Sequence, residues 1–413
     1  MTPGVRGRAG AFALLVVSLG LALGAAEVGL RFAGYEPLHA VYSQPELFWR
    51  YDERLGWALE PGAEGRYAGP RPFPVEFEAT IQTNSLGLRG PELGRRAPDE
   101  LRVLFLGDSL VAGFEVEQAE TFVALVEAQL APRFRVPVRV INAAVRGYGT
   151  DQSYLWFREH GRALGADLVI AVFSANDFAD NVTLHRPRRP FGKSAFALRS
   201  NGALELIGVP VPRYELCSAW VLDGAYRPVR IDGTLSRGAC FLQTRLADHS
   251  ALFTLVATSL ARLPGLVRLL QKLALPGEGA AEASLAPWPL RFAQAGGAPG
   301  GDPLGDPARA RVESELTTAL LQALAREVRE SGAAFALLMT PRHWERLDTR
   351  ALRADGIEAS YVTISTGIER SLLRFRNDSH WNARGHRLFA QGLTPFVEEE
   401  LRAVLRKRAG AAR

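Results

Sequence analysis

The sequence predicts an α/β protein with a parallel five-stranded sheet and helices on both faces, a three-layer α/β/α arrangement. Short, almost continuous apolar runs recur along the chain, and stretches with helical periodicity separate them. Strands that alternate with helices are typical of a parallel sheet covered on both sides. Continuous apolar runs, as opposed to alternating ones, indicate strands whose two faces are both buried.

The first strand is expected at residues 101–106 (LRVLFL), directly before Gly107. A helix should follow from 118 to 130, because Pro132 cannot continue it. The same alternation then repeats through the rest of the core. Further strands are expected at 138–143, 167–173, 333–339 and 359–364, and further helices at 151–164, 307–330 and 383–406.

Four parts are expected along the chain. Residues 1–34 are an N-terminal apolar segment, 35–99 a lead-in, 100–181 together with 309–413 the core, and 182–308 an insertion into the core. The lead-in is rich in Pro, Gly and aromatic residues, and the insertion breaks the rhythm of strands and helices.

Both additions to the core have some predicted structure of their own. The lead-in should be β-rich, with a strand pair around 75–83 and a turn at 84–90 (NSLGLRG). The insertion should hold a hairpin at 196–208, a loop between its two cysteines, and an apolar helix at 250–273. A segment rich in Pro, Gly and Ala at 276–308 is expected to be irregular.

The N-terminus predicts export. Arg6 and Arg8 precede an uncharged run at 9–26, which is about the minimum length for a tilted membrane helix. The positive-inside rule keeps these arginines in the cytoplasm, so the chain after Glu27 should lie outside. A cleaved signal peptide is the alternative, because the small residues at 24–26 suit a signal peptidase. The segment therefore predicts a single-pass membrane protein, or a secreted protein if the segment is removed.

The composition excludes one class of partner and leaves one covalent link open. The net charge is +5, but the arginines are scattered, so no basic stripe suggests nucleic-acid binding. The only cysteines, Cys217 and Cys240, fall in the exported part, where one disulfide could form. Two separate buried thiols are the alternative, since sequence cannot place the two Cα atoms within bridging range.

The loops after the first three strands carry residues suited to acyl transfer. In a parallel sheet, ligands bind beyond the carboxyl ends of the strands. Ser109, in Gly-Asp-Ser-Leu after the first strand, is placed near a helix start as a nucleophile, with a helix N-cap as its structural alternative. Gly147 follows the second strand, where its backbone N–H could bind an oxyanion, or where it could serve only a plain turn. Asn176 follows the third, where a buried side-chain amide could donate to the same oxyanion.

A histidine with a nearby carboxylate precedes the final helix. His380 is the side-chain type best matched to proton transfer near neutral pH, and Asp378 lies two residues before it. His386 should pack or cap within that helix. His343, after the fourth strand, is at the correct end of the sheet to touch substrate, or is a solvated loop residue. The other histidines are dispersed without the spacing of metal ligands, so no metal and no organic cofactor are predicted.

These four segments, in this order, resemble the SGNH (GDSL) hydrolase superfamily. Ser109, Gly147, Asn176 and His380 stand at the four positions that give the superfamily its name. The resemblance covers about 101–181 and 312–405. It implies a flavodoxin-like fold, a catalytic triad, and an oxyanion hole made of the N–H groups of Ser109 and Gly147 and the Asn176 amide.

The lead-in turn NSLGLRG, the GYGT loop and the segment NDFADN also resemble bacterial membrane-anchored members. This resemblance implies a bacterial inner-membrane protein with a periplasmic catalytic domain. The chain departs from the commonest family pattern at two places. Asn377 stands three residues before the histidine, where the acid is usual, and Ser174 stands where glycine is commoner. Since an Asp-x-His spacing occurs in some acyltransferase-like branches, Asp378 is the predicted acid.

The predicted activity is hydrolysis of an O-acyl ester, in the first instance acetyl, through an acyl-enzyme. Export and anchoring favour an ester on a cell-envelope glycan or lipid as substrate. An O-acyltransferase that modifies an exported polysaccharide would use the same residues. A non-catalytic carbohydrate-binding module is a third reading, against which all four characteristic residues are retained.

Overall fold

The structure is a computed structural model that describes the backbone of most of the chain. The described residues are 5–37, 49–68, 76–184, 192–212, 216–221, 225–230, 238, 241–242, 245–247, 249–260, 307–340, 344–362, 369–376, 378 and 380–411. Two units can be distinguished by their internal contacts. One comprises Met1–Ser43, Gly69–Val75 and Glu215–Ala280, and the other comprises Gln44–Ala68, Glu76–Tyr214 and Ala281–Arg413.

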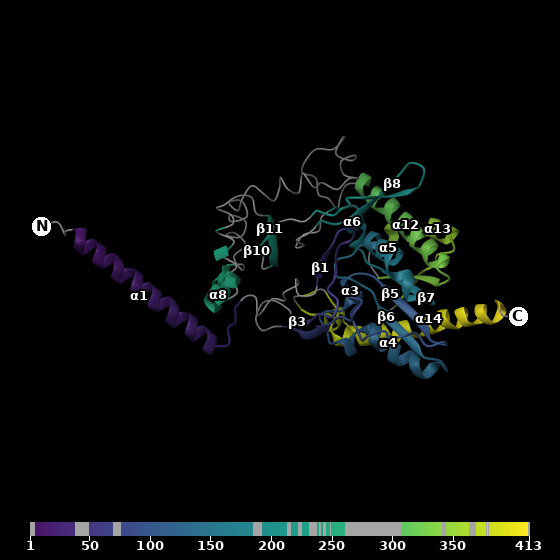
Figure 1. Cartoon of the computed structure of the whole chain (residues 1–413), viewed down its shortest axis with the longest axis horizontal. Coiled ribbons are helices and arrows are strands. Elements are labelled where there is room, and N and C mark those ends of the chain that lie inside the picture. The colour runs from purple at the N-terminus through teal and green to yellow at the C-terminus, as the bar shows by residue number, and fades with distance from the viewer. Residues whose placement is uncertain are drawn as a thin grey trace. The chain divides into compact units, whose positions relative to one another are not determined.

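The larger unit is built on five parallel strands in the order β13-β12-β7-β5-β6 (Figure 1). Numbered along the chain and read from the β6 edge, this is the 2-1-3-4-5 order of flavodoxin-like folds. All residues of β5 and β7 are buried, as their continuous apolar sequences require. The predicted fold class is confirmed. The strands are β5 (Leu101–Leu106), β6 (Val138–Asn142), β7 (Leu168–Phe173), β12 (Ala334–Met339) and β13 (Ala359–Tyr361).

Helices cover both faces of this sheet. α4 (Phe122–Leu130) packs against α14 (Ala383–Ala411), and α5 (Thr150–Glu159) packs against α12 (Pro307–Glu330). In Figure 1 these two pairs lie on opposite sides of the strands. Three shorter helices lie in the connections that follow β5, β7 and β12. They are α3 (Ser109–Ala112), α6 (Asp177–Asn181) and α13 (Thr349–Ala354).

Two predicted helix boundaries are wrong for local reasons. The expected helix 118–130 is interrupted at Thr121, whose extended backbone lets its side chain cap α4 at Ala124 N, so that 118–120 forms a separate 3₁₀ turn. The expected helix 151–164 ends at Glu159, and 161–164 also forms a 3₁₀ turn.

The lead-in is β-rich, as expected. β1 (Trp49–Asp52) pairs with β2 (Gly56–Leu59), and β3 (Glu64–Ala68) pairs with β4 (Glu78–Gln82), both antiparallel. The turn that follows is closed by Asn84, whose side-chain oxygen accepts from Leu86 N and Leu88 N. The same turn contains Arg89, which is buried at 2% exposure.

The insertion begins with the expected hairpin. β8 (Ala195–Leu198) pairs with β9 (Leu204–Ile207) and belongs to the larger unit. The segment expected to be irregular, 276–308, lies outside the described residues up to 306. Its last two residues instead begin α12, which starts with Pro307.

The smaller unit contains the N-terminal helix α1 (Val5–Phe32) and α8 (Ala251–Leu260). Residues 10–32 of α1 are long and apolar enough to cross a membrane, a test that a signal sequence also passes. Glu27 of α1 accepts hydrogen bonds from Ser250 Oγ, Ala251 N and Leu252 N, so its carboxylate caps the start of α8. This unit also holds the hairpin of β10 (Leu216–Val221) and β11 (Ala225–Arg230).

Candidate active site

The turn after β5 presents Ser109 at the start of a short helix. A side chain at Gly107 would place its Cβ 2.6 Å from Val111 Cγ2, so the tight turn requires glycine. Asp108 is the N-cap of α3, because its side chain accepts from Leu110 N at 2.9 Å. The capping role considered for the serine is therefore taken by its neighbour. Ser109 is half-buried.

The lead-in fixes the far end of this helix. Gly113 ends α3 in the left-handed conformation, with φ of 61°. The guanidinium of Arg89 donates to the carbonyls of Ala112 at 2.7 Å and Val116 at 2.6 Å, and also to that of Gly113. A buried cation thus satisfies the carbonyls at the C-terminal end of α3 and one in the segment that follows it.

Ser109, His380 and Asp378 lie in a hydrogen-bonded row. Nε2 of His380 is 2.8 Å from Ser109 Oγ. Nδ1 of the same ring is 2.5 Å from Asp378 Oδ1. The structure therefore brings together three side chains that the sequence separates by up to 271 positions, in the order nucleophile, base and acid.

The loop that carries His380 is held by the residue at the start of α14. Asn382 donates from its backbone N–H to Leu373 O at 3.0 Å and from its amide to Leu372 O at 3.1 Å. Gly385 lies so close to Leu373 O that an added Cβ would approach it to 2.3 Å. These contacts fix the backbone on which the imidazole stands. Asn377 lies outside the described residues.

The charges of the row are set by its surroundings. Burial by itself would lower the pKa of His380, but the Glu115 carboxylate and the hydrogen bond to Asp378 outweigh it, and the pKa is raised. Burial would raise the pKa of Asp378, but its hydrogen bonds and charge contact with His380 lower the pKa to about 2. Asp378 is therefore ionised at neutral pH, and His380 binds a proton more readily than a free imidazole.

The loop after β6 lies against the nucleophile turn. Val145 N donates to Gly107 O at 3.2 Å, and Gly147 is buried with φ of 82°, which favours glycine. The lead-in supports this loop, because Trp57 Nε1 donates to Arg146 O at 3.2 Å. Tyr148 returns a hydrogen bond from its hydroxyl to Trp57 O at 2.5 Å.

Asn176 is not buried, in contrast to the expectation from the sequence. It is exposed at the start of α6, and its amide nitrogen donates to Asp180 Oδ2 at 2.9 Å. The reason is local, since Asp180 follows one helical turn later on the same side. An amide nitrogen carries two hydrogens, so one remains for another acceptor.

Residues 105–388, more than half of the chain, match the family model of the GDSL-like lipase/acylhydrolase family. The chain belongs to this family. The resemblance noted in the sequence is therefore confirmed, and the protein is a serine hydrolase of the GDSL class. No curated protein sequence matches this GDSL-like hydrolase significantly.

Solved structures with some similarity to this GDSL-like hydrolase include TesA, with 12% identity, coverage of 71% of this chain and 96% of that one, and a TM-score of 0.34. The psychrotrophic esterase EstA from Pseudoalteromonas sp. has 12% identity, coverage of 73% and 98%, and a TM-score of 0.36. A catalytic mutant of Axe2, an acetylxylan esterase from Geobacillus stearothermophilus, has 13% identity, coverage of 71% and 92%, and a TM-score of 0.23. Because these scores are low, membership of the family stands on the sequence match.

Two charged residues of this GDSL-like hydrolase that sequence reasoning missed lie beside the histidine. Glu115 is buried, and its Oε1 is 3.4 Å from His380 Nδ1. The same oxygen accepts a hydrogen bond from Arg146 Nη1 in an ion pair. The sequence offered one signal for Glu115, which is that this carboxylate stands between the apolar residues Phe114 and Val116. A carboxylate that is buried among apolar residues needs a buried polar or charged partner.

Glu115, Asp378 and His380 also form the one group in the described part of the chain that has the donor atoms to hold a metal ion, within 4.8 Å of one another. Arg146 already places a cation on Glu115. A second cation at this point would be repelled, so the arrangement fits an internal ion pair better than a metal centre.

A buried carboxyl group, that of Asp177, lies at the start of α6. Burial, with the nearby charges of Asp108 and Asp180, raises the pKa of Asp177 well above its ordinary value. Thr150, the first residue of α5, donates from its hydroxyl to Asp177 Oδ2 at 2.9 Å. This hydrogen bond ties the segment after β6 to the one after β7.

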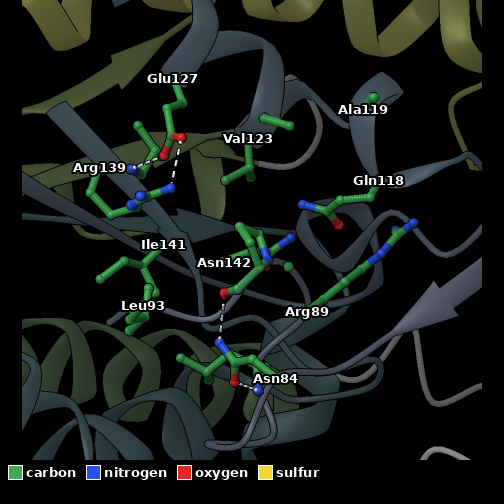
Figure 2. Close-up of a pocket in the computed structure, with 15 residues that line it drawn as sticks. Asn84, Arg89, Leu93, Gln118, Ala119, Val123, Glu127, Arg139, Ile141 and Asn142 are labelled. Carbon is green, nitrogen blue, oxygen red and sulfur yellow. Dashed lines mark hydrogen bonds and ion pairs between the residues drawn. The ribbon is translucent and has the colours of Figure 1, made fainter. Parts of the chain in front are cut away.

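The pocket drawn in Figure 2 lies away from this row of side chains. It has a volume of about 310 Å³ and lies between the lead-in turn, α4 and β6. Asn84, Gln118, Val123 and Ile141 contribute to its lining, and none of the lining residues belongs to the predicted triad or oxyanion hole. It is therefore not the site at which an ester would meet Ser109.

Several predicted residues are not placed by the structure. His343 and Cys240 lie outside the described residues, so substrate contact by the former and a disulfide to Cys217 stay predictions. His386 packs in the final helix as expected. It is buried, accepts from Phe122 N at 3.2 Å, and its pKa is lowered to about 3, chiefly by burial.

Proposed function

We propose that this GDSL-like hydrolase cleaves an O-acyl ester through an acyl-enzyme, with Ser109 as nucleophile, His380 as general base and Asp378 as the acid. The row of hydrogen bonds at 2.8 Å and 2.5 Å carries this proposal. It aligns a hydroxyl, an imidazole and an ionised carboxylate in the relation that serine hydrolysis requires.

The reaction begins when Ser109 Oγ attacks the ester carbonyl and His380 Nε2 takes the hydroxyl proton. The developing oxyanion is stabilised by the N–H groups of Ser109 and Gly147 and by the second amide hydrogen of Asn176. When the tetrahedral intermediate collapses, the imidazolium gives its proton to the leaving alcohol. Water then attacks the acyl-enzyme, His380 accepts its proton, and the carboxylic acid leaves while Ser109 Oγ regains a proton.

The proposed substrate is an acetyl ester on a cell-envelope glycan or lipid. The N-terminal helix supports this class, because either a membrane anchor or a signal sequence would bring the hydrolase domain to the envelope. An anchored enzyme reaches polymers and lipids that stay at the same surface.

A second candidate is transfer of the acyl group to a sugar hydroxyl on an exported polysaccharide. The Asp-x-His spacing of Asp378 and His380 favours it, since that spacing resembles acyltransferase-like branches. The acyl-enzyme is common to both activities, and the acceptor that resolves it decides between them.

The test uses full-length protein purified in detergent. We expect release of acetate from p-nitrophenyl acetate, loss of that activity in Ser109→Ala with the circular dichroism spectrum unchanged, and fluorophosphonate labelling at Ser109 alone. Ser331→Ala, at the residue that follows α12, is the control and should keep full activity. Turnover that survives in Ser109→Ala would exclude Ser109 as nucleophile. Acetylated oligosaccharide formed when a sugar acceptor is added would favour transfer over hydrolysis.

A further inference from the structure

A second carboxylate lies on the same side of the imidazole as Asp378. Glu115 follows α3 by three residues, and its side chain is fully buried. Its Oε1 is 3.4 Å from His380 Nδ1, the nitrogen that Asp378 also contacts. Its other oxygen, Oε2, is buried without a hydrogen-bond partner among the described residues.

The partner of this carboxylate connects it to the loop after β6 that carries Gly147, called the oxyanion loop below. Arg146 pairs with Glu115 Oε1 and directly precedes Gly147. The guanidinium of Arg146 is held over the rings of Tyr67, at 4.9 Å, and Phe114, at 5.5 Å. The ion pair is therefore fixed in position, with one end beside the base and the other beside the glycine.

A buried ion pair by itself is weak evidence for a stabilising role, because apolar residues of the same volume are often as stable. This pair also leaves one carboxylate oxygen without a partner, which costs free energy. A role in the chemistry of His380 gives a reason for that cost.

We propose that Glu115 is a positioning residue for the proposed hydrolysis, a second carboxylate that stabilises the His380 imidazolium and, through Arg146, fixes the oxyanion loop relative to the base. The inference rests on the proposed function of Ser109 and His380. Glu115 does not touch the substrate and acts through His380 and Arg146.

The charged groups that face His380 act in opposite directions. Glu115 and Asp378 favour the imidazolium, and Arg146 opposes it. His386 stays neutral near neutral pH, because burial, followed by the charges of Arg89 and His380, lowers its pKa to about 3. Removing the charge of Glu115 while Arg146 keeps its own should therefore make His380 harder to protonate.

The pH dependence of kcat/KM provides the first test. In full-length Glu115→Gln, we expect the acid-side inflection to fall by about one pH unit, because His380 stays neutral to lower pH. We expect kcat on the plateau to fall about 10-fold, since the imidazolium in the transition state loses one of its two carboxylates. Glu115→Asp keeps the charge and should give an inflection between those of the wild type and the Gln variant.

Glu100→Gln is the matched control. Glu100 is also a buried carboxylate paired with an arginine, Arg102, but it lies at the opposite end of β5 from Ser109. It should leave the inflection unchanged. An unchanged inflection in a folded Glu115→Gln protein would overturn the proposal and leave Glu115 a structural ion pair.

A direct titration of the His380 imidazole by NMR in the Ser109→Ala background separates this proposal from the proposed function. This readout needs no turnover. A lower pKa of His380 in Ser109→Ala/Glu115→Gln than in Ser109→Ala supports the action of Glu115 even if the protein proves not to hydrolyse esters. An identical pKa in the two variants overturns it even if Ser109 is the nucleophile.

Discussion

The carboxylate of Asp378 accepts two hydrogen bonds from His380, one from the backbone N–H at 2.7 Å and one from ring Nδ1 at 2.5 Å. The first bond links the two residues through the backbone of His380, and the second orients the imidazole, whose Nε2 faces Ser109 Oγ. An acid two residues before the histidine can thus reach the same nitrogen that an acid at the commoner spacing would serve. The short connection also leaves the ring little freedom to rotate.

The first prediction concerns which residue before the histidine acts as the acid. An ionised carboxylate holds the productive tautomer and stabilises the imidazolium, which a neutral amide cannot do. Asp378→Asn should therefore reduce kcat by up to about 10⁴-fold, and Asn377→Ala should cost far less. Steady-state kinetics of both variants, with circular dichroism to verify folding, measure the difference. If Asn377→Ala proved the more damaging, Asp378 would be a cap for the loop and no part of the catalytic row.

The second prediction follows from the raised pKa of His380. The imidazole must be neutral to accept the proton of Ser109, so activity is lost as the pH falls through its folded-state value. Because that pKa lies above the ordinary 6.5, the acid-side inflection of kcat/KM should fall above pH 6.5. Asp378, with a pKa of about 2, stays ionised across this range and should add no second inflection. An inflection below pH 6 for p-nitrophenyl acetate hydrolysis would contradict the assignment of His380 as base.

The third prediction concerns Arg89, which holds the end of the nucleophile helix. Arg89→Met keeps most of the buried volume but leaves three carbonyls without their donor. We expect a loss of about 3 kcal/mol in the free energy of unfolding and a lower kcat, since α3 carries Ser109. Denaturant unfolding at constant m-value measures the first effect. Arg95→Met, at an exposed position of the same lead-in, should change stability by less than about 0.5 kcal/mol. Equal stability of the two variants would show that the carbonyls find other partners.

The sheet could be predicted because its strands carry their own signal. β5 and β7 are apolar on both faces, and such continuous apolar sequences indicate strands of a sheet that is covered on both sides. Because the strands are parallel, the loops after them fall at one edge of the sheet. This rule predicts Ser109 at that edge, and the family resemblance adds His380 to the same site. Their contact at 2.8 Å agrees with that expectation.

The parts that could not be predicted depend on side-chain packing. Glu115 and Arg146 are 31 positions apart, and no periodicity indicates that their charges meet beside His380. Asn176 was expected to be buried, but its orientation is decided by Asp180 one turn later. Such contacts are set by rotamers and by competing local partners, and the sequence pattern contains neither.

The last prediction concerns the N-terminal helix. Arg6 and Arg8 precede residues 10–26, which are exposed along their whole length, as expected of a surface that lipid would cover. α1 continues as one helix through the small residues at 24–26 to Phe32, and Glu27 is bonded to the start of α8. We predict a retained anchor, with a cleaved signal peptide as the alternative. Alkaline phosphatase fused after Tyr35 should be active, and the full-length protein should resist extraction with carbonate. A soluble product whose sequence begins between residues 25 and 27 would show instead that the segment is removed, and an inactive fusion would reverse the orientation.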